Sequence, residues 1–133
     1  MSRRDVGRRG EDLAAAYLAR QGLTIRDANW RPTGTAYAPW LRGELDLVAQ
    51  DAEGTWIFVE VRTRRGAPGR AEESVTPAKQ RQVLALARTY LAAHDLPEDG
   101  VAWRVDVVAI HLGADNRAAV HWLPGAITGE DAG

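Results

Sequence analysis

The chain begins with apolar residues at helical spacing. Between about Arg3 and Arg20 they recur every three or four positions, which predicts an amphipathic helix. Ser2 and Asp5 have the spacing of a capping box, in which two side chains bind backbone groups at the start of a helix. The apolar stripe consists of Leu13, Ala14, Tyr17 and Leu18.

The middle of the chain alternates between apolar and polar residues. This pattern over 43–50 and 55–64, with a turn at 51–54, predicts a β-hairpin. In the first strand Leu45 and Leu47 should share one face, opposite Glu44, Asp46 and Val48. In the returning strand Ile57, Val59 and Val61 should share one face, opposite Trp56, Phe58, Glu60 and Arg62.

The remaining elements complete one α/β domain. Residues 23–30 are expected to form a strand before the hairpin, and 101–111 and 120–123 two strands after it. Thr76 and Pro77 are typical of a helix start, and this second helix should end near His94. The order is then αβββαββ, with a mixed central sheet flanked by helices. A chain of 133 residues suits a single domain, 1–133, with a core of about 3–123 and a tail at 124–133.

Residues 32–42 contain two prolines and a glycine, which predicts a loop before the hairpin. Tyr37 and Trp40 are unusual in a plain connection. They either pack onto the domain or stay exposed, where they could stack on a nucleobase.

Two carboxylates of the hairpin are candidates for a metal site. With the turn centred near residue 53, Asp46 and Glu60 would be cross-strand neighbours, about 5 Å apart. Glu60 interrupts a strongly apolar run, where an unpaired charge is costly. Hard cations such as Mg²⁺ take carboxylate oxygens as ligands. The alternative is an ion pair of Glu60 with Arg62 or Arg104.

Glu11 and Lys79 could face the same site from the two helices. Glu11 lies near the inward stripe of the first helix, but it could equally complement the dipole at that helix's start. Sixteen of the 17 basic residues are arginines, and the one lysine, Lys79, is in the first turn of the second helix. An ammonium differs from a guanidinium in hydration and in its pKa, although chance also explains a last lysine. A functional Lys79 should bring its nitrogen within about 10 Å of the carboxylates.

Charge is segregated along the chain, although the net charge is only −1. Residues 1–31 and 62–90 carry +3 and +5, whereas residues 32–61 and 91–133 carry −4 and −5. Such segregation could present a basic face to phosphates beside an acidic cluster. The same pattern also arises from solvated charges that happen to cluster, so it decides nothing alone.

Several classes of site are missing from the sequence. The chain has no cysteine, which excludes disulfides, thiolate nucleophiles and cysteine-ligated metals. Ser2 and Ser74 are not in a nucleophile elbow, and no glycine-rich phosphate loop is present. No apolar run approaches the roughly 20 residues of a membrane span, and no apolar leader follows the N-terminus. We expect a soluble cytoplasmic protein with no membrane partner.

An ordered series of motifs, continuing to about residue 111, resembles the YraN-type family of small bacterial proteins. The motifs are Gly7, Gly10-Glu11, Asn29-Trp30-Arg31, Gly43-Glu44-Leu45-Asp46-Leu47-Val48, Phe58-Val59-Glu60-Val61-Arg62-Thr63-Arg64, Lys79 and Arg104-Val105-Asp106-Val107-Val108-Ala109-Ile110.

That family is in turn similar to the restriction-endonuclease-like superfamily, close to archaeal Holliday-junction resolvases. The resemblance implies an αβββαβ core and a metal-dependent site. Glu11 matches the first-helix glutamate, Asp46 the hairpin aspartate and Glu60 the acid of the E-x-K motif. Arg62 stands where those nucleases have lysine, and a guanidinium cannot serve as a general base. Loop 32–42 also looks longer than is usual in the family. Lys79 and Gln80 match polar positions on the helix after the motif.

The sequence therefore favours a metal-dependent endonuclease, or a nuclease-like protein, acting on branched or structured DNA. Asp46 and Glu60, with Glu11 and the Val61 carbonyl, would hold Mg²⁺ or Mn²⁺. The alternatives are a non-catalytic nucleic-acid-binding protein and a scaffold domain that keep the fold. A resolvase-like role would favour a homodimer. The expected phosphate-positioning residues are Arg62, Lys79 and Gln80, and the expected nucleic-acid-binding residues are Arg8, Arg9, Arg31, Arg64 and Arg65.

Overall fold

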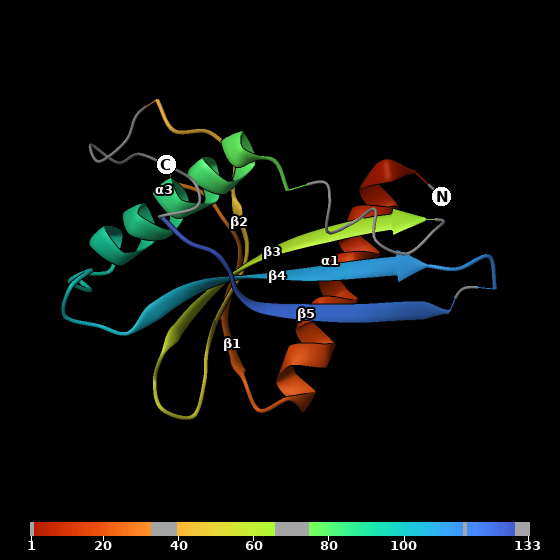
Figure 1. Cartoon of the computed structure of the whole chain (residues 1–133), viewed down its shortest axis with the longest axis horizontal. Coiled ribbons are helices and arrows are strands. Elements are labelled where there is room, and N and C mark those ends of the chain that lie inside the picture. Colours follow the sequence, from red (N-terminus) through yellow and green to blue (C-terminus); the bar gives the residue numbers. More distant parts are fainter. Residues whose placement is uncertain (1, 33–39, 66–74, 116, 130–133) are drawn as a thin grey trace.

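A computed structural model of the chain describes residues 2–32, 40–65, 75–115 and 117–129. They form one mixed α/β domain, whose elements follow the predicted order (Figure 1). The elements are the helix α1 (Arg3–Arg20), the strands β1 (Thr24–Trp30), β2 (Leu45–Gln50) and β3 (Trp56–Arg65), the helix α3 (Pro77–Ala93), and the strands β4 (Trp103–Leu112) and β5 (Ala118–Ile127).

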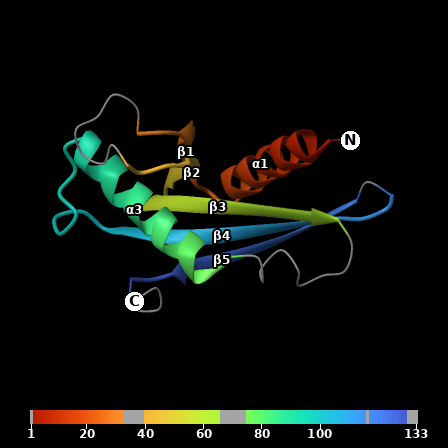
Figure 2. The same ribbon diagram turned by 90° about the horizontal axis from the view of Figure 1, so that it is seen from above.

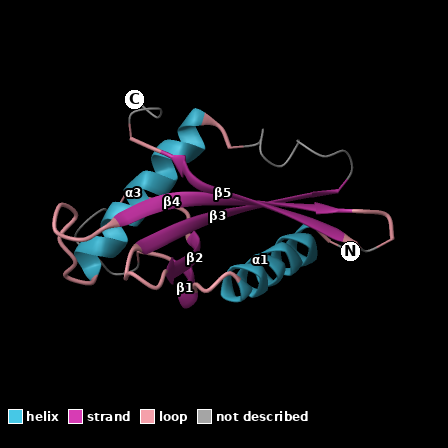
Figure 3. Cartoon of the chain, turned by 60° about the horizontal axis from the view of Figure 1, so that its bottom comes forward, coloured by secondary structure: helices cyan, strands magenta, loops and turns pink. Residues whose placement is uncertain are grey.

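The five strands form a single sheet in the order β1-β2-β3-β4-β5. Neighbouring strands are antiparallel except β3 and β4, which run parallel. Because parallel neighbours need a crossover connection, α3 lies across one face of the sheet between them. α1 covers the other face, as Figures 2 and 3 show. The predicted fold class, a mixed central sheet flanked by helices, is confirmed.

Both helices begin where their capping residues predict. The Ser2 hydroxyl accepts a hydrogen bond from the Asp5 amide at 3.1 Å, and the Asp5 carboxylate accepts one from the Ser2 amide at 3.3 Å. The Thr76 hydroxyl accepts from the Lys79 amide at 3.2 Å, with Pro77 at the first helical position. In the part of the chain that the structure describes, neither helix has the length and apolar character needed to cross a membrane.

An apolar core lies on each face of the sheet, and β3 contributes to both. Ile57 and Val59 pack on the α1 side, whereas Phe58 packs on the α3 side. Glu60 continues the Phe58 side, so the alternation predicted for this strand is confirmed. This alternation directs the Glu60 side chain toward the start of α3.

The alternation predicted for β2 is wrong at the beginning of the strand. Leu47 packs in the core beside α1, but Leu45 packs in the core beside α3. The β2–β3 ladder extends from the Gln50–Trp56 pair to the Leu47–Val59 pair. Leu45 lies beyond that ladder, where the chain can turn, and it therefore does not share a face with Leu47.

The last strand is longer than the sequence predicts. β5 continues to Ile127, which is buried, so residues 124–127 belong to the sheet rather than to a tail. Of the two loop aromatics, Trp40 is 75% exposed and does not pack onto the domain. Tyr37 lies outside the described residues.

Asp106 of β4 joins the last two strands through a buried carboxylate. Its side chain accepts hydrogen bonds from Trp122 Nε1 at 2.9 Å and from the Gly125 amide at 2.8 Å, both on β5. Arg104 Nε also donates to Asp106 Oδ1, at 2.9 Å. Buried charge requires such partners. Arg104 is thus paired with Asp106, and the predicted alternative of a Glu60–Arg104 ion pair is wrong.

Candidate metal and nucleic-acid site

Asp46 and Glu60 lie next to each other where the β2–β3 ladder ends. Asp46 Oδ2 accepts a hydrogen bond from the Val61 amide at 2.8 Å, so this side chain binds the backbone of β3 just beyond the last ladder pair. Glu60 is 3% exposed and close enough to form a side-chain hydrogen bond with Asp46. Two carboxylates share a hydrogen bond only when one of them is protonated.

The proximity of these two acids changes their acidity. Burial, together with the negative charge of Glu60, raises the pKa of Asp46 to about 8, although the Val61 amide opposes the shift. Burial also raises the pKa of Glu60, whereas Lys79 and Arg62 act to lower it. A buried acidic pair of this kind is stabilised by added positive charge.

Two side-chain cations contact Glu60. The Arg62 guanidinium lies 3.4 Å from Glu60 Oε1, and Lys79 Nζ lies 3.9 Å from the same oxygen. The lysine nitrogen is therefore well inside the distance that the sequence argument required. The Glu60–Arg62 ion pair, which was the structural alternative for Glu60, is also present. Both interactions occur together at the start of α3.

Two further carboxylates lie close to Asp46. One carboxylate oxygen from each of Glu11, Glu44 and Asp46 lies within 4.8 Å of the other two. The sequence predicts Glu11 and Asp46 as site residues but does not single out Glu44. The signal was available, because Glu44 was predicted on the same face as Asp46, two residues away.

A close approach of α1 to the sheet places Glu11 in this cluster. A Cβ added to Gly10 would lie only 2.9 Å from Thr63 Cβ, so the helix contacts β3 at a position where only glycine fits. Glu11 follows directly, and its carboxylate reaches the beginning of β2. Gly10 thus allows the close approach, whereas an added Cβ at Gly7 would meet nothing within 4 Å.

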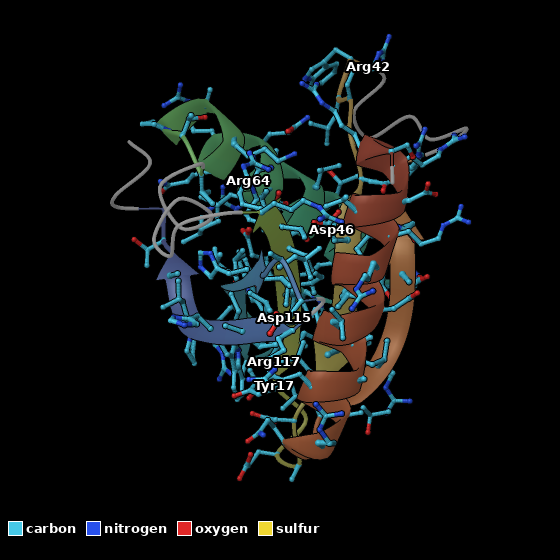
Figure 4. All side chains as sticks on the ribbon, turned by 90° about the vertical axis from the view of Figure 1, so that its right-hand side faces the viewer. Tyr17, Arg42, Asp46, Arg64, Asp115 and Arg117 are labelled. Atoms are coloured by element: carbon cyan, nitrogen blue, oxygen red, sulfur yellow. The ribbon has the colours of Figure 1, made fainter. Side chains whose placement is uncertain are left out.

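A groove of about 740 Å³ opens beside the carboxylates, between α1 and the end of β3. Arg3 lines it from the helix, and Arg62, Arg64 and Arg65 line it from the strand. In the view of Figure 4, the labelled Asp46 lies below Arg42 and Arg64, beside the N-terminal half of α1. The remaining lining residues are Val6, Gly7, Glu11, Val61 and Thr63.

The other predicted site residues lie elsewhere. Arg8 is exposed and Arg9 is half-buried on α1, and neither lines the groove. Arg31 Nε binds Glu44 at 2.9 Å, so it contacts the acidic cluster rather than the groove. The Gln80 side-chain amide donates to the Val75 carbonyl at 3.1 Å and thereby holds the segment that leads into α3.

Comparison with known proteins identifies relatives over most of the chain. The sequence model described as "Uncharacterised protein family UPF0102" matches residues 10–110. A UPF0102 protein of Roseiflexus castenholzii is 48% identical over 109 residues, which cover 81% of this chain and 80% of the relative. A UPF0102 protein of Syntrophotalea carbinolica is 46% identical over 125 residues, which cover 93% of this chain and 92% of the relative. Residues 10–110 include the four carboxylates of the site, Glu11, Glu44, Asp46 and Glu60.

Proposed function

We propose, for a chain that belongs to the uncharacterised protein family UPF0102, a function as a Mg²⁺- or Mn²⁺-dependent endonuclease acting on branched or structured DNA. The observation that carries the proposal is the contact of Arg62 and Lys79 with Glu60, the neighbour of Asp46, together with an arginine-lined groove to which Arg62 also belongs. The preference for branched DNA rests on the resemblance to Holliday-junction resolvases. A cytoplasmic location fits such a substrate.

The donor atoms of the site suit a hard divalent cation. Asp46 would be the central ligand, because it neighbours both Glu60 and the Glu11–Glu44 pair. All of these groups offer oxygen, which Mg²⁺ and Mn²⁺ prefer, and the Val61 carbonyl would add a further oxygen. A cation would also relieve the repulsion within the buried acidic pair.

The protein's own residues would bind and orient the phosphodiester. A divalent cation supplies Lewis-acid activation of water and of the phosphate in such sites. Arg62 is permanently charged, so it would stabilise phosphate charge but not accept a proton. Lys79, which contacts the same Glu60 oxygen as Arg62, would contact the phosphate or position the attacking water. The two cations thus share the task that one lysine performs in the related nucleases.

The groove would accommodate the nucleic-acid backbone next to the carboxylates. Arg3, Arg64 and Arg65 are exposed, and they lie on both of its walls. Phosphate contacts from such residues fix the register of a nucleic acid without reading its sequence. We therefore expect affinity that depends on salt and on the shape of the substrate rather than on base sequence.

A cleavage assay tests the activity. Labelled four-way, flapped and linear DNA is incubated with the protein in Mg²⁺ or Mn²⁺, and Asp46→Asn serves as the inactive variant. We expect cleavage of the branched substrates by the wild type only. Cleavage that is equal for the wild type and Asp46→Asn would refute the assignment of the site.

Calorimetric titration with Mn²⁺ tests the ligands separately. Asp46→Asn should lose binding, and comparison of Glu60→Gln with Glu44→Gln shows on which side of Asp46 the cation is held. Wild-type affinity in all three variants would refute the metal site.

One observation favours a second candidate function, nucleic-acid binding without cleavage. Glu60 already has two cationic partners, Arg62 and Lys79, which neutralise it without a metal ion. A protein of this kind would bind branched DNA with the same salt dependence and leave it intact in either cation. A scaffold domain, the third possibility from the sequence, would bind no nucleic acid at all.

A further inference from the structure

Asn29, near the end of β1, has an unusual backbone conformation. Its φ is 52°, in the left-handed region that glycine favours, and Asp95 is the one other non-glycine residue with positive φ in the described part of the chain. This conformation costs most residues roughly 1–2 kcal/mol, and asparagine tolerates it best after glycine. Such conformations persist where the surrounding structure fixes them, often at functional sites.

The distortion lies directly opposite Asp46. Ala28 pairs with Leu47 and Trp30 pairs with Leu45, so Asn29 occupies the position that faces Asp46 across the β1–β2 ladder. Asn29 Nδ2 donates to Glu11 Oε1 at 2.7 Å and to Glu44 Oε1 at 2.9 Å. A single amide group therefore connects α1, β1 and the residue that precedes β2.

We infer that Asn29 is a positioning residue, which holds Glu11 and Glu44 in place for a divalent cation at Asp46. The inference rests on the proposed function. Three carboxylates within 4.8 Å repel one another, and Mg²⁺ demands near-ideal ligand geometry. A neutral amide compensates the repulsion through two hydrogen bonds, yet it adds no positive charge that would compete with the cation.

Arg31 provides the natural contrast, because it binds the same acid with a charged group. Its Nε donates to Glu44 Oε2 at 2.9 Å, and its side chain is 69% exposed. Removing the guanidinium leaves both hydrogen bonds of Asn29 intact. Loss of this positive charge should leave the affinity for a divalent cation unchanged or increase it, whereas loss of the Asn29 amide should decrease it.

The test compares Mn²⁺ binding by the wild type, Asn29→Gly and Arg31→Met in calorimetric titrations. Glycine keeps the left-handed backbone available and removes both donors. We expect Asn29→Gly to bind Mn²⁺ about 10- to 100-fold more weakly, the usual effect of losing a group that orients metal ligands. Wild-type affinity in Asn29→Gly would overturn the inference and leave the proposed function standing. Absence of Mn²⁺ binding by the wild type would instead overturn the proposed cation site, and this inference with it.

A second measurement uses the wild type alone and does not depend on the folding of a variant. In ¹⁵N-labelled protein the side-chain amide signals of Asn29 should shift as Mg²⁺ is added, because the cation draws charge from both carboxylates that the amide contacts. The shifts should saturate together with the calorimetric binding curve. Unchanged Asn29 side-chain signals at saturating Mg²⁺ would contradict the inference.

Discussion

The contact between Gly10 of α1 and Thr63 of β3 allows the assembly of the site to be tested by one methyl group. In Gly10→Ala the new Cβ would clash with Thr63 Oγ1, and it would lie 2.9 Å from Thr63 Cβ and 3.1 Å from its Cγ2. Carbon atoms in contact settle at about 3.5–4.0 Å. Rotation of the Thr63 side chain moves Cγ2 away but leaves Cβ in place. The helix must therefore shift outward by roughly 1 Å.

The expected cost follows from two opposing effects. Overpacking a well-packed contact destabilises a protein by about 1–3 kcal/mol. Replacing glycine by alanine within a helix stabilises the folded state by up to about 1 kcal/mol. Gly10→Ala should then lower the free energy of unfolding by about 1–2 kcal/mol. Gly7 lies on the same helix, and nothing would be within 4 Å of its added Cβ. Gly7→Ala is the matched control and should stabilise the protein by up to about 1 kcal/mol.

Urea-induced unfolding, followed by circular dichroism, measures both effects. Thr63→Ala removes two of the atoms that crowd position 10, so Gly10→Ala should cost less in that background. A coupling of at least about 0.5 kcal/mol between the two substitutions is expected. The predicted clash between positions 10 and 63 is contradicted if Gly10→Ala is as stable as Gly7→Ala, or if the two substitutions at positions 10 and 63 are additive.

Three further predictions concern charge. The pKa of Asp46 is about 8 in the folded protein and near 3.8 in the unfolded chain, so the folded state retains the proton more tightly. As pH rises from about 4 to about 8, the free energy of unfolding of the wild type should therefore fall, by at most about 1.4 kcal/mol per pH unit. Urea unfolding of Asp46→Asn should lack this decline, and parallel pH profiles would contradict the prediction. The double variant Arg64→Glu, Arg65→Glu should weaken DNA binding equally for all sequences, as measured by fluorescence anisotropy. The logarithm of the wild-type affinity should fall linearly with the logarithm of the salt concentration. If the wild type binds neither DNA nor RNA at low salt, the groove is excluded as a nucleic-acid-binding site. Lys79→Met should abolish DNA cleavage without loss of folding, whereas Arg62→Lys should preserve or raise the cleavage rate. Full cleavage activity in Lys79→Met would show that the lysine takes no part in the reaction.

Features that depend on neighbouring residues in the sequence were predictable. The Ser2–Asp5 capping box and the Thr76–Pro77 helix start involve contacts within one turn, so their sequence pattern is sufficient to locate them. The alternation of β3 is regular because the strand is paired with β4 along its whole length, from the Trp56–Trp103 pair to the Arg65–Leu112 pair. For the same reason the sequence indicated that Glu60 and Phe58 share a face.

The arrangement of the acids at the start of β2 was less accessible from the sequence. Leu45 turns away from the Leu47 face because the β2–β3 ladder has ended, which no alternation pattern signals. The left-handed conformation of Asn29 depends on contacts with two acids from distant parts of the chain. Glu44 is brought to the cluster by such long-range contacts, which the sequence pattern does not show. Its spacing of two residues from Asp46 was the one signal that the sequence offered.

The buried carboxylate of Asp106 has a consequence for how copies of this chain could associate. β5 is an edge strand, and exposed edges can pair with a strand of another molecule through their free amide and carbonyl groups. Pro124 has no amide hydrogen, and the Gly125 amide is already bound to Asp106 at 2.8 Å. Two successive positions of this edge therefore have no hydrogen to offer to an incoming strand. A homodimer, as a resolvase-like role would favour, would have to form without extending the sheet across the C-terminal half of β5, and its two sites would be related through another surface.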